Sequence, residues 1–241
     1  PMPAQWVAAA ESGMRTRVYS ITGSPNIMGA LMVMTAPMLA ALAYYVKPLW
    51  AKCLMWGCTG ILCLAVLATF SRGAWFGLAV AVFLFCLIVD VKLLVVVAIG
   101  VLALFFCVPT IANRITFLFT SDFAQANNNG GRGQRWAMGF VLLRTSPIWG
   151  FGLGRFGGAI AMQNQTIENL DYFYMDNYYM KTLVEMGYVG LTAYILLLLS
   201  NLLASIRGLF KTRNDRMSLL SVGMFCGMIG VLTHSFFENI F

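Results

Sequence analysis

The chain has 241 residues, of which 60% are hydrophobic and 10% charged, and its formal net charge is +7. Because soluble domains carry about 25% charged residues, this composition excludes a soluble nucleic-acid binder, a disordered tail and a secreted disulfide mini-protein. The basic residues form no single run, and in membrane proteins such an excess reflects topology. The composition therefore predicts an all-α, polytopic bundle of transmembrane helices, with membrane lipids around it and no nucleic-acid partner.

Six uncharged stretches are each about long enough to cross roughly 30 Å of hydrocarbon as a helix. The predicted spans are 27–46, 53–70, 73–89, 93–112, 186–206 and 217–237. They divide the chain into four first spans with an outward N-terminal stretch (1–112), a long, partly helical loop (113–177) and two last spans (178–241). The sequence looks like a fragment of a longer multi-span protein.

Basic residues at the ends of the spans predict the orientation. Alternating the loops places seven of them in three short loops on one side, which should be cytoplasmic. They are Lys47, Lys52, Lys92, Arg207, Lys211, Arg213 and Arg216. The N-terminal stretch up to Asn26, the turn at Ser71-Arg72 and the loop 113–177 are then expected on the opposite, extracytoplasmic face.

The expected outer face is rich in arginine, whose planar fork binds phosphate oxygens bidentately. An anionic, phosphate-bearing ligand is therefore expected there. For a single arginine, contact with lipid headgroups or pairing with Asp122, Glu168 or Asp171 is the more common role. Arg72 differs, because a charge between two apolar spans is costly and usually functional. The outer basic residues are Arg15, Arg17, Arg72, Arg114, Arg132, Arg135, Arg144, Arg155 and Lys181.

Several other kinds of chemistry have no support in the sequence. All six cysteines lie inside predicted spans without metal-ligand spacing, so we expect small packing residues rather than ligands or disulfides. There is no P-loop, and the glycines of 150–155 follow no strand, which disfavours a dinucleotide site. We therefore expect neither a metal nor a cofactor.

Three stretches combine distinctive residues at fixed spacing. They are Ser71-Arg72-Gly73, then Gly131-Arg132 with Trp136, Ser146-Pro147 and the glycines of 150–156, and finally Asp176-Asn177 followed by Gly187 and Gly190. Taken in this order of spans and loop, they resemble motifs of the O-antigen ligase and O-antigen polymerase superfamily of bacterial envelope membrane glycosyltransferases. The resemblance covers nearly the whole chain and implies the C-terminal portion of such a protein. One departure is that Asp176 stands where the related ligases carry a histidine proposed as the base.

The resemblance implies a glycosyltransferase of the bacterial inner (plasma) membrane, active in cell-envelope polysaccharide and lipopolysaccharide synthesis. Its donor would be a glycan linked to a polyprenyl pyrophosphate such as undecaprenyl pyrophosphate. Its acceptor would be a hydroxyl of a glycan or a lipid-anchored molecule on the extracytoplasmic face. The choice between ligase and polymerase stays open.

Such a transfer needs cations to stabilise the departing pyrophosphate and a base near the acceptor hydroxyl. We expect Arg72 and Arg132 to bind the pyrophosphate and Asp176 to take the proton. Asp176 is equally well placed to cap the helix that follows it, and the two roles are compatible. Further candidates for substrate binding are Arg135, Arg155, Asn177, His234 and Glu238.

Two pairs of charged or polar residues are spaced one helical turn apart. Lys181 and Glu185 are expected to form a structural ion pair. His234 and Glu238 are expected to share a helical face, as a structural pair or in acceptor activation.

The alternative function is a polytopic transporter or channel for an anionic or lipid-linked substrate. A transporter would place charges in the middle of its spans and paired helix breaks near mid-membrane. Here the charges lie mostly at the ends of the spans, which favours chemistry at the outer surface.

Overall fold

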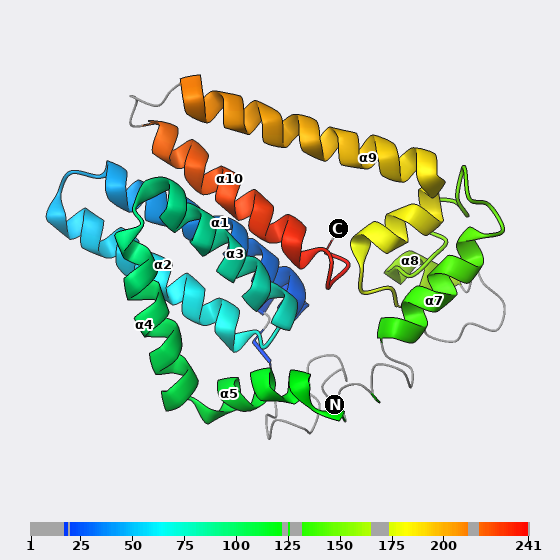
Figure 1. Cartoon of the computed structure of the whole chain (residues 1–241), viewed down its shortest axis with the longest axis horizontal. Coiled ribbons are helices and arrows are strands. Elements are labelled where there is room, and N and C mark those ends of the chain that lie inside the picture. The colour runs from blue at the N-terminus through cyan, green and yellow to red at the C-terminus, as the bar shows by residue number, and fades with distance from the viewer. Residues whose placement is uncertain are drawn as a thin grey trace. The chain divides into compact units, whose positions relative to one another are not determined.

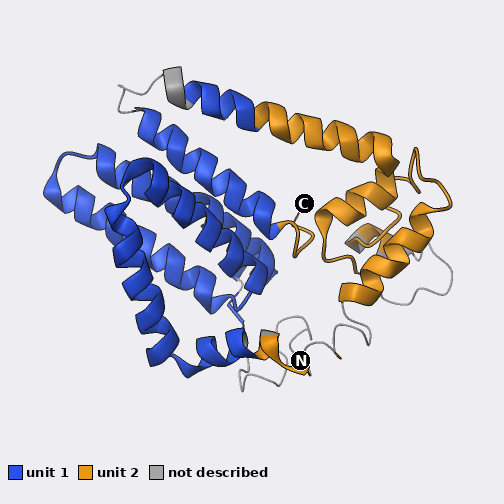
Figure 2. Ribbon diagram, viewed as in Figure 1, with its two compact units in different colours: residues 1–116, 202–234 blue, residues 117–201, 235–241 orange. Residues whose placement is uncertain are grey.

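A computed structural model describes residues 17–18, 20–121, 125, 132–164, 174–211 and 217–240. Within these ranges the regular elements are all helices (Figure 1). The chain forms two compact units, which consist of residues 1–116 with 202–234 and of residues 117–201 with 235–241 (Figure 2). The all-α helix bundle predicted from the sequence is confirmed. The predicted three-part division separates spans from a loop, whereas these units group residues that pack together.

Among the described residues, the first unit contains, besides the end of α9 (Tyr178–Lys211), six whole α-helices. They are α1 (Pro25–Tyr45), α2 (Leu49–Ala68), α3 (Arg72–Val89), α4 (Lys92–Cys107), α5 (Pro109–Thr116) and α10 (Met217–His234), with the short 3-10 helix η3 (Ser20–Thr22) before α1. The second unit contains the 3-10 helix η4 (Phe117–Phe119), α7 (Arg132–Leu143), α8 (Ala159–Asn164) and the part of α9 (Tyr178–Lys211) up to Asn201.

Four of the described helices are long and apolar enough to cross a membrane, namely α1, α2, α3 and α9. The helices α4 and α10 are equally apolar but shorter. The predicted fourth span, 93–112, is wrong at its end, because α4 stops at Cys107 and a new helix begins at Pro109. A residue that precedes proline is disfavoured in the helical conformation, which explains the interruption at Val108. The last span was likewise predicted to reach Phe237 but ends at His234.

Helix α10 packs against both α1 and α3 in the first unit, through glycines on its surface (Figure 1). A Cβ atom on Gly223 would lie 2.6 Å from the carbonyl oxygen of Pro37 in α1. A Cβ atom on Gly230 would lie 2.8 Å from the carbonyl oxygen of Gly77 in α3. Small residues at such crossings allow the close backbone approach on which helix packing in membranes depends. Helix α10 is therefore held between α1 and α3 by contacts that larger side chains would prevent.

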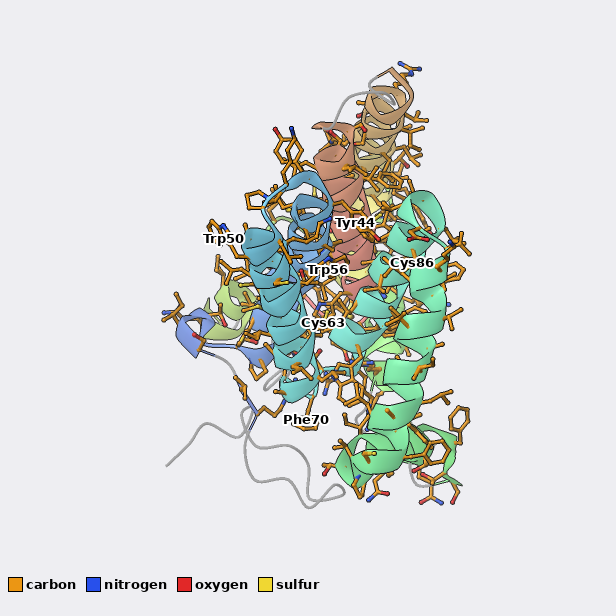
Figure 3. All side chains as sticks on the ribbon, turned by 90° about the vertical axis from the view of Figure 1, so that its left-hand side faces the viewer. Tyr44, Trp50, Trp56, Cys63, Phe70 and Cys86 are labelled. Carbon is orange, nitrogen blue, oxygen red and sulfur yellow. The ribbon has the colours of Figure 1, made fainter. Side chains whose placement is uncertain are left out.

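Aromatic and sulfur side chains fill the other end of this unit. The ring of Tyr44 lies 5.6 Å from Trp56 and 6.4 Å from Phe85 (Figure 3). Cys226 is buried in the same cluster, and Cys86 is buried in α3 next to Phe85 in the sequence. All six cysteines are free, as expected, but Cys53 and Cys107 are exposed on apolar helices. The exposure of those two among the described residues does not support the expected role as packing residues.

Helix α9 is broken at Gly187, whose backbone has φ 66° and ψ −170°. The break separates a short half-helix, 178–186, from the longer segment that starts at Tyr188. Because φ is positive there, a side chain at this position would be strained. The predicted span began at Met186, next to the break, whereas the helix long and apolar enough to cross a membrane is Tyr178–Gly208.

The loop between α7 and α8 fills this break. The amide of Phe151 donates to the carbonyl oxygen of Val184 at 2.8 Å. In the opposite direction, the amide of Tyr188 donates to the carbonyl oxygen of Pro147 at 2.9 Å. Backbone groups freed by a break must find partners where water is absent. The proline and glycines of this loop therefore serve to bring its backbone into contact with α9.

We expect Gly187→Ala to destabilise the protein, because a Cβ atom there would collide with the backbone of Ile148 and the residue would keep a positive φ. A strained backbone of this kind costs about 1–3 kcal/mol. Gly60→Ala is the matched control, since Gly60 lies in α2 with nothing within 4 Å of its Cβ position. The melting temperatures of both variants are measured by thermal unfolding in detergent. Equal melting temperatures for Gly187→Ala and the wild type would contradict the importance of the break.

Candidate functional site

Asp176 and Arg132 meet at the start of α9 in the second unit. The Nε atom of Arg132 donates to Oδ2 of Asp176 at 2.6 Å, and Nη2 of the same guanidinium donates to the carbonyl oxygen of Phe237 at 3.0 Å. The side chain of Asp176 is 8% exposed and that of Arg132 41% exposed. Oδ1 of Asp176 is buried and has no hydrogen-bond partner among the described residues. One oxygen of this carboxylate is thus fixed by an arginine, and the other remains available as an acceptor.

Arg135 approaches the same carboxylate from one helical turn further along α7. Its Nη1 atom lies 3.6 Å from Oδ2 of Asp176 and 3.5 Å from the carbonyl oxygen of Tyr174. Spacing of three residues puts Arg132 and Arg135 on one face of the helix. Helix α7 therefore presents two guanidinium groups to one buried carboxylate.

The side chain that caps α9 is Asn177, not Asp176. Oδ1 of Asn177 accepts a hydrogen bond from the amide of Met180 at 3.0 Å, the third residue of the helix. The expectation that Asp176 caps this helix is therefore wrong, because its carboxylate is turned to the arginines of α7 instead. Asn177 was predicted to bind substrate, and the structure shows its side chain engaged at the helix start.

Tyr174 and Glu238 complete this group of residues. The hydroxyl of Tyr174 has one proton to donate and lies 2.8 Å from Oε1 of Glu238 and 3.1 Å from the carbonyl oxygen of Asn239. Burial, and then the negative charge of Glu238, raises the pKa of Tyr174 far above its ordinary value. The phenol therefore stays protonated and keeps donating. We call Arg132, Arg135, Tyr174, Asp176 and Glu238 the Asp176 cluster.

His234 and Glu238 do not share the predicted helical face. Helix α10 ends at His234, and the residues that follow turn away from the helix. The carbonyl oxygen of Ser235 accepts from the amide of Tyr178 at 3.0 Å, so it supplies a partner to one of the free amides at the start of α9. The prediction of a shared helical face is wrong, because the chain after His234 does not continue α10. Instead, the carbonyl oxygen of Ser235 accepts from Tyr178 of α9, and that of Phe237 accepts from Arg132.

Lys181 and Glu185 form the expected ion pair, with Nζ 3.0 Å from Oε2. The other oxygen of Glu185 accepts from the backbone amide of Phe156 at 3.2 Å. Glu185 is only 3% exposed. It therefore links the first half of α9 to the glycine-rich loop, a role that the i,i+4 spacing alone did not indicate.

Arg155 lies in that loop, and its guanidinium carbon is 5.5 Å from the centre of the Phe151 ring. The structure does not bring Arg155 into the Asp176 cluster.

Tyr178 and Tyr179 on the first half of α9 meet Tyr194 beyond the break, at ring distances of 5.6 Å and 6.3 Å. These rings pack on each other across the break.

Arg72 lies in the first unit, at the first position of α3. Ser71 caps this helix by accepting a hydrogen bond from the amide of Ala74. The preceding residue, Phe70, has a positive φ of 51°. Arg17 fixes the turn by donating from Nε to the carbonyl oxygen of Thr69 at 2.8 Å. A strained backbone persists only where its surroundings hold it, and such positions cluster at functional sites.

Some expectations fall on residues outside the described ranges. They are Arg15, Asp122, Gly131, Glu168, Asp171, Arg213 and Arg216.

Sequence reasoning missed Tyr174 as a member of the Asp176 cluster. The one sequence feature that could have indicated this role is its position two residues before Asp176. Several other tyrosines lie nearby in the sequence, so this position did not distinguish it.

The O-antigen ligase family model matches residues 57–195 of this chain. The match covers more than half of the chain and includes Arg72, Arg132, Asp176 and Gly187, whereas His234 and Glu238 lie beyond it. A comparison with curated proteins gave no match. The matched segment contains every residue of the Asp176 cluster except Glu238. This helical, multi-pass membrane protein therefore belongs to the O-antigen ligase family.

Proposed function

We propose that this protein transfers a glycan from a polyprenyl pyrophosphate to an acceptor hydroxyl on the extracytoplasmic face of the bacterial inner membrane. The family gives the general class, a membrane enzyme of O-antigen biosynthesis. The observation that carries the proposal is the Asp176 carboxylate. It is buried, one oxygen is held by Arg132, and the other has no partner among the described residues.

In the proposed reaction, the acceptor oxygen attacks the anomeric carbon of the donor sugar. A new carbon–oxygen bond forms, and the bond from that carbon to the pyrophosphate breaks. The hydroxyl proton passes to Asp176, and the polyprenyl pyrophosphate leaves as an anion. A general base within hydrogen-bond reach of the proton it takes contributes typically about 10²–10⁴-fold to such a step.

The charges within the Asp176 cluster cancel, so the cluster alone supplies little positive charge to a departing pyrophosphate. The cluster contains two guanidinium groups and two carboxylates, so the formal charge of these described residues is zero. A departing pyrophosphate therefore needs further positive charge. We propose that Arg72 supplies it, because Arg72 stands at a helix N-terminus, where backbone amides also favour an anion. In this scheme Arg132 both orients Asp176 and faces the donor, and no metal ion takes part.

The break in α9 bears on the rival function, a transporter. In transporters, broken helices leave backbone groups free to coordinate ions or substrates. In this protein the loop 146–152 occupies the groups freed at Gly187. The break thus serves to shape the second unit, which favours the enzyme over the transporter.

The acceptor decides between ligase and polymerase. The aspartate at position 176, where the related ligases carry histidine, adds weight to a polymerase. The glycan profile of a deletion strain tests this choice. Loss of the chain-length ladder with single units still attached to the anchor identifies a polymerase, whereas intact polymer left on its lipid carrier identifies a ligase. An unchanged glycan profile would contradict the proposed function.

The topology is tested by cysteine labelling in a background that lacks the six native cysteines. We expect Thr145→Cys, in the loop after α7, to react with a membrane-impermeant thiol reagent in intact cells. Lys47→Cys, between α1 and α2, should react only after the membrane is opened. Both residues are exposed in the structure, so burial within the protein does not prevent labelling. The reverse pattern would place the Asp176 cluster on the cytoplasmic face and contradict the proposal.

A further inference from the structure

His234 is a buried polar side chain that the reaction scheme does not use. It is the last residue of α10 and is 0% exposed. The sequence suggested it as a substrate-binding residue, and the structure encloses its side chain completely. An imidazole buried among apolar helices is costly, so its presence calls for a specific partner.

One partner of His234 is the residue that caps α3. Its Nε2 atom lies 3.4 Å from Oγ of Ser71, which is itself 6% exposed. In neutral histidine, either the hydroxyl donates to Nε2 or the protonated Nε2 donates to the hydroxyl. In both arrangements the oxygen of Ser71 still accepts from the amide of Ala74. The imidazole thus holds the capping oxygen in place from the side of α10.

Glycines make room for this contact. A Cβ atom on Gly77 of α3 would lie 3.3 Å from Cβ of His234. A Cβ atom on Gly29 of α1 would lie 2.7 Å from Ala74 and 3.8 Å from Cε1 of His234. The ends of α1, α3 and α10 therefore come together around the imidazole.

The turn before Arg72 is held from several directions. The amide of Ser71 donates to Oγ1 of Thr69, and the hydroxyl of Thr69 donates to the carbonyl oxygen of Val66 at 2.7 Å. Phe70, between Thr69 and Ser71, has the strained positive φ. Because Arg72 follows Ser71 directly, the direction in which its side chain leaves the helix depends on this cap.

We infer that His234 is a positioning residue, which orients Arg72 toward the donor pyrophosphate by fixing Ser71. The inference rests on the proposed role of Arg72 and adds a residue beyond the segment matched by the family. His234 acts without touching the substrate. Its loss should weaken pyrophosphate binding more than it weakens the fold.

The test measures the dissociation constant of farnesyl pyrophosphate, a short polyprenyl pyrophosphate, for the full chain in lipid nanodiscs. We expect His234→Phe and Ser71→Ala each to weaken binding by about tenfold, the effect of losing one net hydrogen bond. The double variant should bind no more weakly than Ser71→Ala alone, because His234 acts only through the Ser71 hydroxyl. His234→Gln, which keeps a hydrogen-bonding group, should restore most of the affinity.

Val222→Ala is the control for stability, since Val222 is a buried residue of α10 in the cluster around Tyr44. It should lower the melting temperature and leave the dissociation constant unchanged. Wild-type affinity in a folded Ser71→Ala or His234→Phe variant would overturn the inference, and so would additive effects in the double variant. If His234→Phe does not fold, Ser71→Ala and His234→Gln decide the question. Undiminished binding by Arg72→Ala would instead overturn the proposed role of Arg72, so the two failures are distinguishable.

Discussion

Replacing Asp176 by asparagine should abolish glycan transfer and leave the fold and donor binding intact. The amide oxygen of asparagine still accepts a hydrogen bond from Nε of Arg132, so the contact with α7 survives. An amide does not take up the acceptor proton, however, and loss of a general base lowers the rate by about 10²–10⁴-fold. Transfer of lipid-linked glycan by the purified variant measures the loss, and farnesyl pyrophosphate binding verifies the donor site.

Asp90→Asn is the matched control for this substitution. Asp90 precedes α4, and its Oδ1 accepts from the amide of Lys92 at 3.0 Å, a contact that asparagine preserves. This variant should transfer glycan at the wild-type rate. A second variant, Asp176→His, introduces the residue that the related ligases carry, and partial activity there would support a shared catalytic position. Wild-type transfer by Asp176→Asn would remove Asp176 from the mechanism.

Arg72→Lys should be almost as inactive as Arg72→Ala. The ammonium group keeps the charge but loses the planar fork that binds two phosphate oxygens at once. Removing one donor to a developing anion costs about 10²–10³-fold in turnover. Glycan transfer by each purified variant, with its melting temperature, separates this effect from misfolding.

Arg144→Lys and Arg144→Ala are the controls for the arginine series. Arg144 is exposed at the end of α7 and has no part in the Asp176 cluster. Both variants should retain transfer activity. If Arg72→Lys is folded and fully active, Arg72 acts as a point charge or a topology signal, and its proposed bidentate contact is wrong.

The sequence was sufficient to predict the membrane-spanning helices, because long uncharged apolar stretches are typical of helices that cross a bilayer. The prediction from sequence failed where a single proline or glycine was given too little weight. Pro109 inside the predicted fourth span was enough to indicate that a helix ends just before it. Gly187 was recognised as part of a Gly-x-x-Gly pattern, but the positive φ that glycine permits was not considered, and the break in α9 was missed.

Contacts between distant segments account for most of what the sequence left open at the site. Asp176 and Asn177 are both good capping residues, so sequence alone could not choose between them. The choice follows from Arg132, which lies 44 residues away and takes the aspartate. Similarly, Glu238 accepts a hydrogen bond from the hydroxyl of Tyr174, 64 residues earlier, a contact that its spacing from His234 did not indicate. Local spacing identified the right residue types but not their partners.

The most direct test of the account is glycan transfer by the purified wild-type protein in lipid vesicles containing a polyprenyl-pyrophosphate-linked glycan, an acceptor and a metal chelator. We expect one glycosylated acceptor for each polyprenyl pyrophosphate released, at the same rate with and without chelator. The Asp176→Asn protein should release neither product. Failure of the wild-type protein to transfer glycan under any of these conditions would contradict the proposed enzyme, and loss of its activity in chelator would contradict a mechanism based on Arg72, Arg132 and Asp176 alone.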